Sequence, residues 1–308
     1  MPSSESRAAS TGAVPDAVRR PLLACARGDL PPNVALVQLF MTAGDDTQAE
    51  IALAETTRQI EQTHASGADR LRAVRRLWDT TPGAFETVRL VLCSHDRPRQ
   101  AAEPAVAHWA DIFDRAAAIS PEAGVALYSL GRPDLLHAIT AEVAAWIHDR
   151  GLLGRERTAL EIGCGTGRFL PVLAPALRFV IGIDISNIML TQARASCGYL
   201  PNSALVHTSG RDLATFADNA FDLVYAVDAF PYLVASGFAA PHFEEAARVL
   251  RPGGTLLICN YSYRGDVTAD AEDVQHLGRA AGLALLSQGA RPFTLWDGTT
   301  FQLQKIEP

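Results

Sequence analysis

Short apolar segments alternate with helical segments through the second half of the chain, and this alternation limits the folds that are open to it. Such a pattern is typical of a parallel sheet with helices on both faces. We therefore expect an α/β fold from residue 154 onward. The predicted strands are 158–162, 179–183, 204–207, 221–227 and 255–259, and the predicted helices between them are 167–176, 189–197, 210–216 and 241–250.

Two more strands complete the predicted sheet, at 283–287 and 301–305, after a helix at 271–281. The segment that joins these two strands shows no helical pattern, and a parallel crossover usually needs a helix. The last strand should therefore run antiparallel to its neighbour. The expected architecture is a seven-stranded, mostly parallel sheet with an antiparallel last strand.

The first half of the chain has only helical patterns. Residues 1–16 are rich in Ser, Ala and Pro and predict a disordered tail. Apolar residues then recur at helical spacing, and Asp46 and Ser120 are typical helix N-caps. We predict that residues 17–153 form a helical region that serves as a lid or as a dimerisation surface for a homodimer, and that residues 154–308 form a separate domain.

A glycine-rich turn follows the first predicted strand, in the run Glu161-Ile162-Gly163-Cys164-Gly165-Thr166-Gly167. Glycines allow a sharp turn and leave room for a ligand against the backbone, and the helix that follows presents unpaired N–H groups there. The turn therefore indicates a site for a nucleotide-like cofactor. A dinucleotide site would need its third glycine at position 168, where this chain has Arg168. The spacing therefore disfavours NAD.

Asp184 ends the second predicted strand, 21 residues after Gly163. A carboxylate at this strand end can accept hydrogen bonds from both ribose hydroxyls of a nucleoside. Asp184 could instead cap the next helix, but Ser186 and Asn187 are better placed to do so. We therefore predict that Asp184 binds the ribose and that Ile185 lies against the adenine.

Two further motifs make the pattern specific. Ser209-Gly210-Arg211-Asp212-Leu213 follows the third strand, and Leu250-Arg251-Pro252-Gly253-Gly254 precedes the fifth. Together with the Gly-x-Gly-x-Gly turn, they resemble the class I S-adenosylmethionine-dependent methyltransferases, in particular the branch that acts on small molecules. The resemblance covers about residues 154–308 and implies a Rossmann-like domain that binds S-adenosyl-L-methionine.

The resemblance also implies roles for the residues of these motifs. The turn that contains Glu161, Gly163, Cys164, Gly165 and Gly167 would pass beneath the methionine part of the cofactor. Asp212 would bind the amino group of the adenine, beside the backbone N–H of Leu213. Asp212 is alternatively an acidic residue at the start of a helix, stabilised by the helix dipole.

The loop after the fourth strand begins at Asp228. Ligands of open α/β sheets sit beyond the carboxyl ends of the strands, so this loop should border the reactive methyl group. Phe230 and Tyr232 in the same loop are equally well explained as core aromatics. The resemblance further points to Tyr128, upstream of the glycine turn, as a residue that folds over the cofactor, although simple packing also explains a tyrosine there.

The reaction that the resemblance implies is in-line transfer of a methyl group to an oxygen, nitrogen or carbon nucleophile. Close placement of the reactants can supply much of the catalysis, so a dedicated base is not required. Asp228, His137 and His242 are the candidate bases. His137 lies on a helix whose apolar face explains its packing, and His242 begins a helix that we expect to be solvated. We therefore assign no catalytic residue.

Charge and composition exclude some classes of function. The net charge is -7 and neither half of the chain is basic, which disfavours nucleic acid as a substrate. No apolar run is long enough for a membrane helix and the N-terminus lacks a signal-peptide pattern, so we expect a cytoplasmic protein. The five cysteines are scattered and predict free thiols without a metal site. We expect a small-molecule substrate; a protein substrate, an NAD-dependent oxidoreductase and a non-catalytic S-adenosylmethionine-binding protein are the alternatives.

Overall fold

The computed structural model describes residues 14–63, 65–95 and 105–306, and it divides into two compact units. One unit extends to Phe85 and the other begins at Glu86, whereas we expected a boundary between 153 and 154. The boundary lies earlier because the helices between residues 105 and 149 belong to the second unit: the helix at 105–119 packs against the helix at 187–197, and the helix at 133–149 shares a core with the sheet. The predicted tail lies outside the described residues, except that the first helix already begins at Asp16.

The first unit is helical, as expected. Its core contains Leu22, Leu36 and Phe40, and the Phe40 ring meets the Trp78 ring edge-on with centroids 5.0 Å apart. Asp45, one residue before the predicted cap, accepts a hydrogen bond from the backbone N–H of Gln48. The helices are α1 (Asp16–Arg27), α2 (Pro32–Thr42), α3 (Asp46–Glu61) and α4 (Ala65–Asp79), and α5 (Ala84–His95) leads into the second unit.

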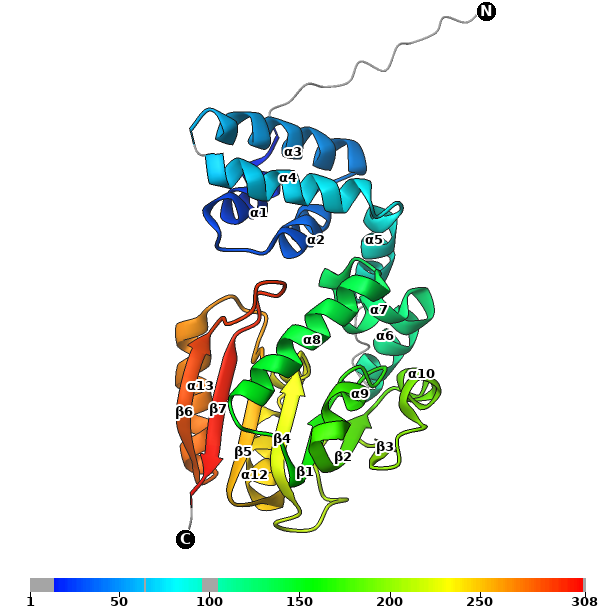
Figure 1. Cartoon of the computed structure of the whole chain (residues 1–308), viewed down its shortest axis with the longest axis vertical. Coiled ribbons are helices and arrows are strands. Elements are labelled where there is room, and N and C mark those ends of the chain that lie inside the picture. The colour runs from blue at the N-terminus through cyan, green and yellow to red at the C-terminus, as the bar shows by residue number, and fades with distance from the viewer. Residues whose placement is uncertain (1–13, 64, 96–104, 307–308) are drawn as a thin grey trace, which may run out of the picture. The chain divides into compact units, whose positions relative to one another are not determined.

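The second unit contains a seven-stranded sheet with the strand order β3-β2-β1-β4-β5-β7-β6. Figure 1 shows the strands in this order, from β3 on the right to β6 on the left. β7 runs antiparallel to both of its neighbours and all the other pairs are parallel, which confirms the predicted sheet. The strands are β1 (Gly154–Ile162), β2 (Leu177–Asp184), β3 (Ser203–His207), β4 (Phe221–Val227), β5 (Leu250–Cys259), β6 (Leu283–Ala290) and β7 (Thr300–Lys305).

Helices cover both faces of the sheet, so the central strands are apolar on both sides. Leu257 packs in one core with Val143 of α8, whereas its neighbour Leu256 packs in the other core with Phe243 of α12. The helices of the second unit are α6 (Ala105–Ile119), α7 (Pro121–Val125), α8 (Pro133–Asp149), α9 (Leu170–Leu173), α10 (Asn187–Cys197), α11 (Phe230–Ala235), α12 (Ala239–Val249) and α13 (Val267–Ala280).

Two predicted helices of this unit are wrong in part or in whole. The helix predicted at 167–176 forms only as α9 and the short η2 (Ala174–Ala176), because Pro175 has no N–H with which to continue α9. Residues 210–216 form an irregular loop instead of a helix. Gly210 has a φ of 66°, and the N–H and the carbonyl of Leu213 both bond to side chains of α12. Within the loop, the Phe216 N–H donates to the Leu213 carbonyl at 3.0 Å, which closes a turn but does not make a helix.

The helical segment before the sheet is also more broken than expected. Ser120 caps α7 as predicted, since its hydroxyl accepts a hydrogen bond of 3.1 Å from the Ala123 N–H. The helix then ends at Val125 and a 3₁₀ turn, η1 (Leu127–Ser129), follows it. None of the helices in the described ranges is long and apolar enough to cross a membrane.

Candidate active site

A cavity lies at the carboxyl ends of β1, β2 and β4, where ligands of open α/β sheets bind. One wall is the glycine turn after β1 and another is α6, with the start of the segment after β4 between them. The predicted site residues in its lining are Glu161, Gly163, Cys164, Gly165, Asp184, Ile185 and Asp228. The sheet thus brings residues from three strand ends to one place, as the sequence predicted.

Positions 163 and 165 of the turn cannot accommodate any residue other than glycine without strain. Gly163 and Gly165 have φ values of 70° and 54°, which L-residues rarely adopt. A Cβ on Gly163 would lie 2.6 Å from the Ala229 Cβ, and one on Gly165 would lie 2.8 Å from a methyl group of Val125. Both the backbone conformation and the close packing against Ala229 and Val125 therefore require glycine here.

Gly167 has a different role from the other two glycines, because it does not line the cavity. Its φ is 75°, and a Cβ there would lie 2.9 Å from the Cys197 Sγ on α10. The third glycine therefore allows the turn to pack against α10. A direct contact between Gly167 and a cofactor stays a prediction.

Asp184 is bound to the glycine turn through its side chain. Its Oδ2 accepts a hydrogen bond of 2.8 Å from the Gly165 N–H, and its Oδ1 accepts one of 2.8 Å from the Ser186 N–H. Burial raises the pKa of its carboxyl, an effect that these two hydrogen bonds oppose. Ser186, not Asp184, caps α10 by accepting from the Met189 N–H. A carboxylate has about four acceptor positions, so Asp184 keeps capacity for hydroxyl groups in the cavity.

Asp228 is fixed by two side chains that approach from different elements. Its Oδ2 accepts a hydrogen bond of 2.8 Å from the Tyr128 hydroxyl, and its Oδ1 accepts one of 2.9 Å from the Asn260 amide. Its φ of 59° lies in the left-handed region, and burial raises the pKa of its carboxyl. Tyr128 itself does not line the cavity but stacks on Trp296, with ring centroids 5.6 Å apart. Tyr128 therefore acts on the cavity through Asp228.

Arg168 is a functional candidate that sequence reasoning missed, since it served there only to exclude a dinucleotide. Arg168 lines the cavity, and its guanidinium donates to two neutral hydroxyls, those of Tyr128 at 3.3 Å and Thr140 at 3.4 Å. Within the described part of the chain, no carboxylate forms an ion pair with it. Its place directly after the glycine turn is the signal that could have revealed it.

Glu161 lies at the base of the cavity and is 2% exposed. Its Oε2 accepts a hydrogen bond of 3.0 Å from the Tyr225 hydroxyl. Burial raises the pKa of this carboxyl to about 8, although the Tyr225 bond and the charge of Arg168 lower it. Glu161 therefore holds a proton at neutral pH.

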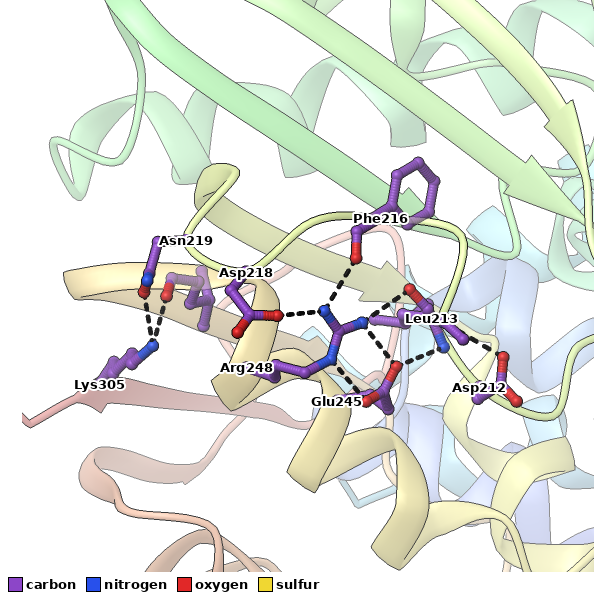
Figure 2. Close-up of polar contacts among 10 residues, drawn as sticks. Asp212, Leu213, Phe216, Asp218, Asn219, Glu245, Arg248 and Lys305 are labelled. Atoms are coloured by element: carbon purple, nitrogen blue, oxygen red, sulfur yellow. Dashed lines mark hydrogen bonds and ion pairs between the residues drawn. The ribbon is translucent and has the colours of Figure 1, made fainter.

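Asp212 and Leu213 lie in the loop next to the cavity but do not line it. An oxygen of Asp212 accepts from the Ala214 N–H at 3.1 Å, and the Leu213 N–H donates to Glu245 at 3.2 Å. Arg248 completes this arrangement by donating to the Leu213 carbonyl at 3.0 Å and to Glu245, as Figure 2 shows. The loop is therefore clamped to α12, and the adenine contacts of Asp212 and Leu213 stay predictions.

His242 is placed differently from our expectation of a solvated helix start, which is wrong. The side chain is buried, with 1% exposed, and it lines the cavity. It shares the buried face of α12 with Ala246 and Val249, which follow at helical spacing. By contrast, His137 on α8 is exposed and does not line the cavity.

Part of the cavity wall is aromatic and comes from two elements, α6 and α11. Trp109 and Phe113 of α6 both pack edge-on against Tyr232 of α11, with ring centroids 4.9 Å and 4.8 Å apart. The Trp109 indole N–H donates to the Ser236 hydroxyl at 2.9 Å. Phe230 is fully buried and belongs to the core, whereas Tyr232 lines the cavity. The sequence predicted α6 as a helix but gave no sign of its place in the site.

The described ranges contain no group of histidine, cysteine and acidic side chains that could hold a metal ion. The described cysteines are free thiols, among which Cys164 is buried beside the cavity.

Comparisons with known proteins identify a family for the central part of this unit. Residues 160–258 match the family model described as a methyltransferase domain. A demethylmenaquinone methyltransferase of Tropheryma whipplei is 38% identical over 105 residues, which are 34% of this chain and 41% of the relative. A 2-methyl-6-phytyl-1,4-hydroquinone methyltransferase of Synechocystis is 31% identical over 112 residues, 35% of this chain and 33% of the relative. The chain thus spans less than half the length of these curated relatives.

One solved structure with a similar arrangement is magnesium protoporphyrin IX methyltransferase from Synechocystis with bound S-adenosylmethionine. It superposes with a TM-score of 0.49 at 16% identity, over 67% of this chain and 100% of that one.

Proposed function

Because the chain carries a class I S-adenosylmethionine-dependent methyltransferase domain, we propose that it transfers the methyl group of S-adenosylmethionine to a small, uncharged organic acceptor. The observation that carries this proposal is the division of one cavity into a charged end and an apolar end. Arg168, Asp184 and Asp228 mark the charged end, and the aromatic wall of Trp109, Phe113 and Tyr232 marks the other.

The charged end suits the polar groups of S-adenosylmethionine. Arg168 would bind the α-carboxylate, since its present hydrogen-bond partners are neutral hydroxyls. Asp228 would face the α-ammonium group, and Asp184 would accept hydrogen bonds from the ribose hydroxyls. The bound cofactor supplies an activated methyl group on its sulfonium. These side chains would hold it beside Gly163 and Gly165, which line the same cavity.

The apolar end suits an acceptor without charge. Trp109 and Phe113 of α6 and Tyr232, Leu233 and Phe238 after β4 contribute no formal charge to the wall. A charged acceptor would lose its water there without a counter-charge, which costs several kcal/mol. The names of the two relatives, which describe a menaquinone precursor and a hydroquinone, support a ring-shaped acceptor of this kind.

Catalysis then follows chiefly from placement. The aromatic wall orients the acceptor and keeps water away from the reacting atoms, while Asp184 and Arg168 hold the donor at the other end. Alignment of this kind can supply a large part of the rate enhancement of a displacement. The contribution of α6 to the cavity wall supports a lid role for this part of the predicted helical region 17–153.

Binding and turnover test the proposal separately. Calorimetric titration should show binding of S-adenosylhomocysteine and none of NADH. Incubation with methyl-labelled S-adenosylmethionine should label neutral phenols and hydroquinones in preference to carboxylic acids and amines of equal size. Binding of NADH alone would refute the cofactor assignment. A preference for charged acceptors would refute the role of the aromatic wall.

The wall itself can be tested by replacing Trp109. Trp109→Ala should raise the KM for the acceptor by roughly tenfold or more, because one aromatic contact and its buried area are lost. The affinity for S-adenosylhomocysteine should change much less. Equal losses for both ligands would place Trp109 against the cofactor instead.

A further inference from the structure

We propose that His242 recognises the purine of the cofactor, by accepting a hydrogen bond at Nε2 from the exocyclic amino group of adenine. This inference rests on the proposed function, because it assumes that S-adenosylmethionine occupies the cavity. It assigns a role to a buried polar side chain that the methyl transfer described above does not use.

His242 and Gly210 both line the cavity, and we place the base of the nucleoside at the end that they share. Glu245, three residues after His242 on α12, accepts a hydrogen bond of 3.2 Å from the Leu213 N–H. His242 therefore lies beside the 210–213 turn. Gly210 of that turn lines the cavity, and a Cβ on it would lie 2.5 Å from an Ile185 methyl group.

The surroundings at this end suit a flat, largely apolar ring. Ile185 and Val106 supply hydrocarbon walls, and Gly210 supplies a backbone without a side chain. Asp184, which is suited to the ribose, directly precedes Ile185 in the chain. A purine next to that ribose would therefore present its edge toward the turn and the start of α12.

The hydrogen bonding of His242 determines which atom it offers to the cavity. Its Nδ1 lies 2.9 Å from the Phe238 carbonyl oxygen, and a carbonyl can only accept. Nδ1 must therefore carry the hydrogen, and Nε2 keeps a free lone pair in the neutral ring. The amino group of adenine is a donor and matches this acceptor, whereas the oxo group of hypoxanthine would oppose it.

The Glu245–Arg248 clamp keeps this geometry fixed. Arg248 donates to Glu245, to Asp218 and to the carbonyls of Leu213 and Phe216, so it ties the loop to the helix that carries His242 (Figure 2). Burial lowers the pKa of His242, although its hydrogen bond to the Phe238 carbonyl and the charges of Asp212 and Glu245 raise it. The ring is therefore neutral near pH 7, as an acceptor at Nε2 requires.

The test compares two nucleosides that differ only at the purine edge. Dissociation constants of S-adenosylhomocysteine and S-inosylhomocysteine are measured by calorimetry at pH 7.5 for the wild type, His242→Leu and His242→Gln. The wild type should prefer S-adenosylhomocysteine by roughly tenfold or more, which corresponds to one matched hydrogen bond. His242→Leu should lose most of this preference, chiefly through weaker binding of S-adenosylhomocysteine. His242→Gln should bind both compounds about equally, because its amide can rotate to accept or to donate.

Acidification provides a second readout. Protonation of Nε2 would remove the acceptor, so the affinity of the wild type for S-adenosylhomocysteine should fall as the pH drops below about 6.5, by at most about tenfold per pH unit. His242→Leu should show no such step. His137→Leu, which changes an exposed histidine of α8, is the matched control and should behave as the wild type.

The outcomes separate this inference from the proposed function. An unchanged purine preference in a folded His242→Leu protein would overturn the inference. So would loss of methyl transfer by that variant with unchanged cofactor binding, since His242 would then act on the acceptor. If the wild type binds neither nucleoside, the proposed function fails first.

Discussion

The two units of the chain place their charged side chains in opposite ways. In the first unit, Arg75 pairs with Glu50 and Arg72 pairs with Glu61 at the surface, and the buried polar residues there, such as Thr56, are uncharged. The second unit buries Glu161 and Asp184 at the edge of its sheet. Burial of carboxyl groups costs free energy unless they are protonated or well bonded. Burial of these carboxyl groups therefore lowers the free energy of unfolding of the second unit, at the place where we expect a polar ligand to bind. The described residues of the first unit contain no buried carboxyl group and show no such effect.

The largest expected effect that tests this contrast is the dependence of stability on pH caused by Glu161. Its pKa is about 8 in the folded protein and 4.5 ordinarily, so the folded state keeps a proton that the unfolded chain releases. Stability contributed by this group is therefore present below about pH 4.5 and is lost as the pH rises toward 8. Because of Glu161, the free energy of unfolding of the wild type should fall by on the order of 3 kcal/mol between pH 5 and pH 8. Glu161→Gln should not show this part of the fall.

Urea denaturation at several pH values measures this effect. Glu156→Gln changes an exposed glutamate of the same strand and should follow the wild type. If Glu161→Gln keeps the full pH dependence, Glu161 is ionised in the folded protein and the contrast between the units weakens.

The next largest effect concerns cofactor affinity. Asp184→Asn replaces the carboxylate that faces the cavity by a neutral amide. One of the two acceptor oxygens becomes an NH2 group, which cannot accept hydrogen bonds from the N–H groups of the protein or from the ribose hydroxyls. The affinity for S-adenosylhomocysteine should fall by roughly 100-fold, about 2.7 kcal/mol, as expected for two charge-assisted hydrogen bonds. Calorimetry measures this loss, and Asp149→Asn, an exposed change on α8, serves as the control. A loss below threefold would show that Asp184 only holds the glycine turn.

A smaller effect is expected from Arg168→Gln. This change removes the cation but keeps a donor for the Tyr128 hydroxyl, so the affinity for S-adenosylhomocysteine should fall by about tenfold. The affinity for 5′-methylthioadenosine, which lacks the amino-acid group, should stay the same. Equal weakening of both ligands would mean that Arg168 supports the cavity rather than the carboxylate.

The smallest effect should come from the first unit. Glu50→Gln breaks an ion pair of 3.0 Å whose side chains are about half exposed, with 44% and 57% of their surfaces accessible. Exposed pairs contribute little because water and salt screen them, so the free energy of unfolding should change by less than about 0.5 kcal/mol. Thermal unfolding measures it. A change comparable to that of Glu161→Gln would show that the first unit also depends on its charges.

Local patterns were sufficient to predict most of the fold. Alternation of strands and helices, the loop without a helix before 301–305 and the Ser120 cap depend on neighbouring residues alone, and they were confirmed. The helix predicted at 210–216 failed because a distant residue, Arg248, bonds to that backbone. The helix propensity of residues 210–216 contains no information about a distant partner of this kind.

The sequence likewise predicted those parts of the candidate site that lie within one local segment of the chain. The glycine turn and Asp184 have fixed spacings within one strand, turn and strand, and the structure brings them together. Arg168 has only its place directly after the glycine turn as a signal, and His242 belongs to no motif. The surroundings of both residues depend on how α8 and α12 pack on the sheet. The place of α6 in the cavity wall likewise depends on packing between distant segments.

The aromatic wall also gives the protein an internal optical reporter. Of the four tryptophans, all within the described ranges, Trp109 alone lines the cavity, whereas Trp146 and Trp296 pack with Phe293 and Trp78 packs with Phe40. Occupancy of the apolar end should therefore change the emission of a single indole, the one whose N–H is bonded to Ser236. Fluorescence of the unlabelled protein can thus follow acceptor binding while the acceptor itself is still being sought.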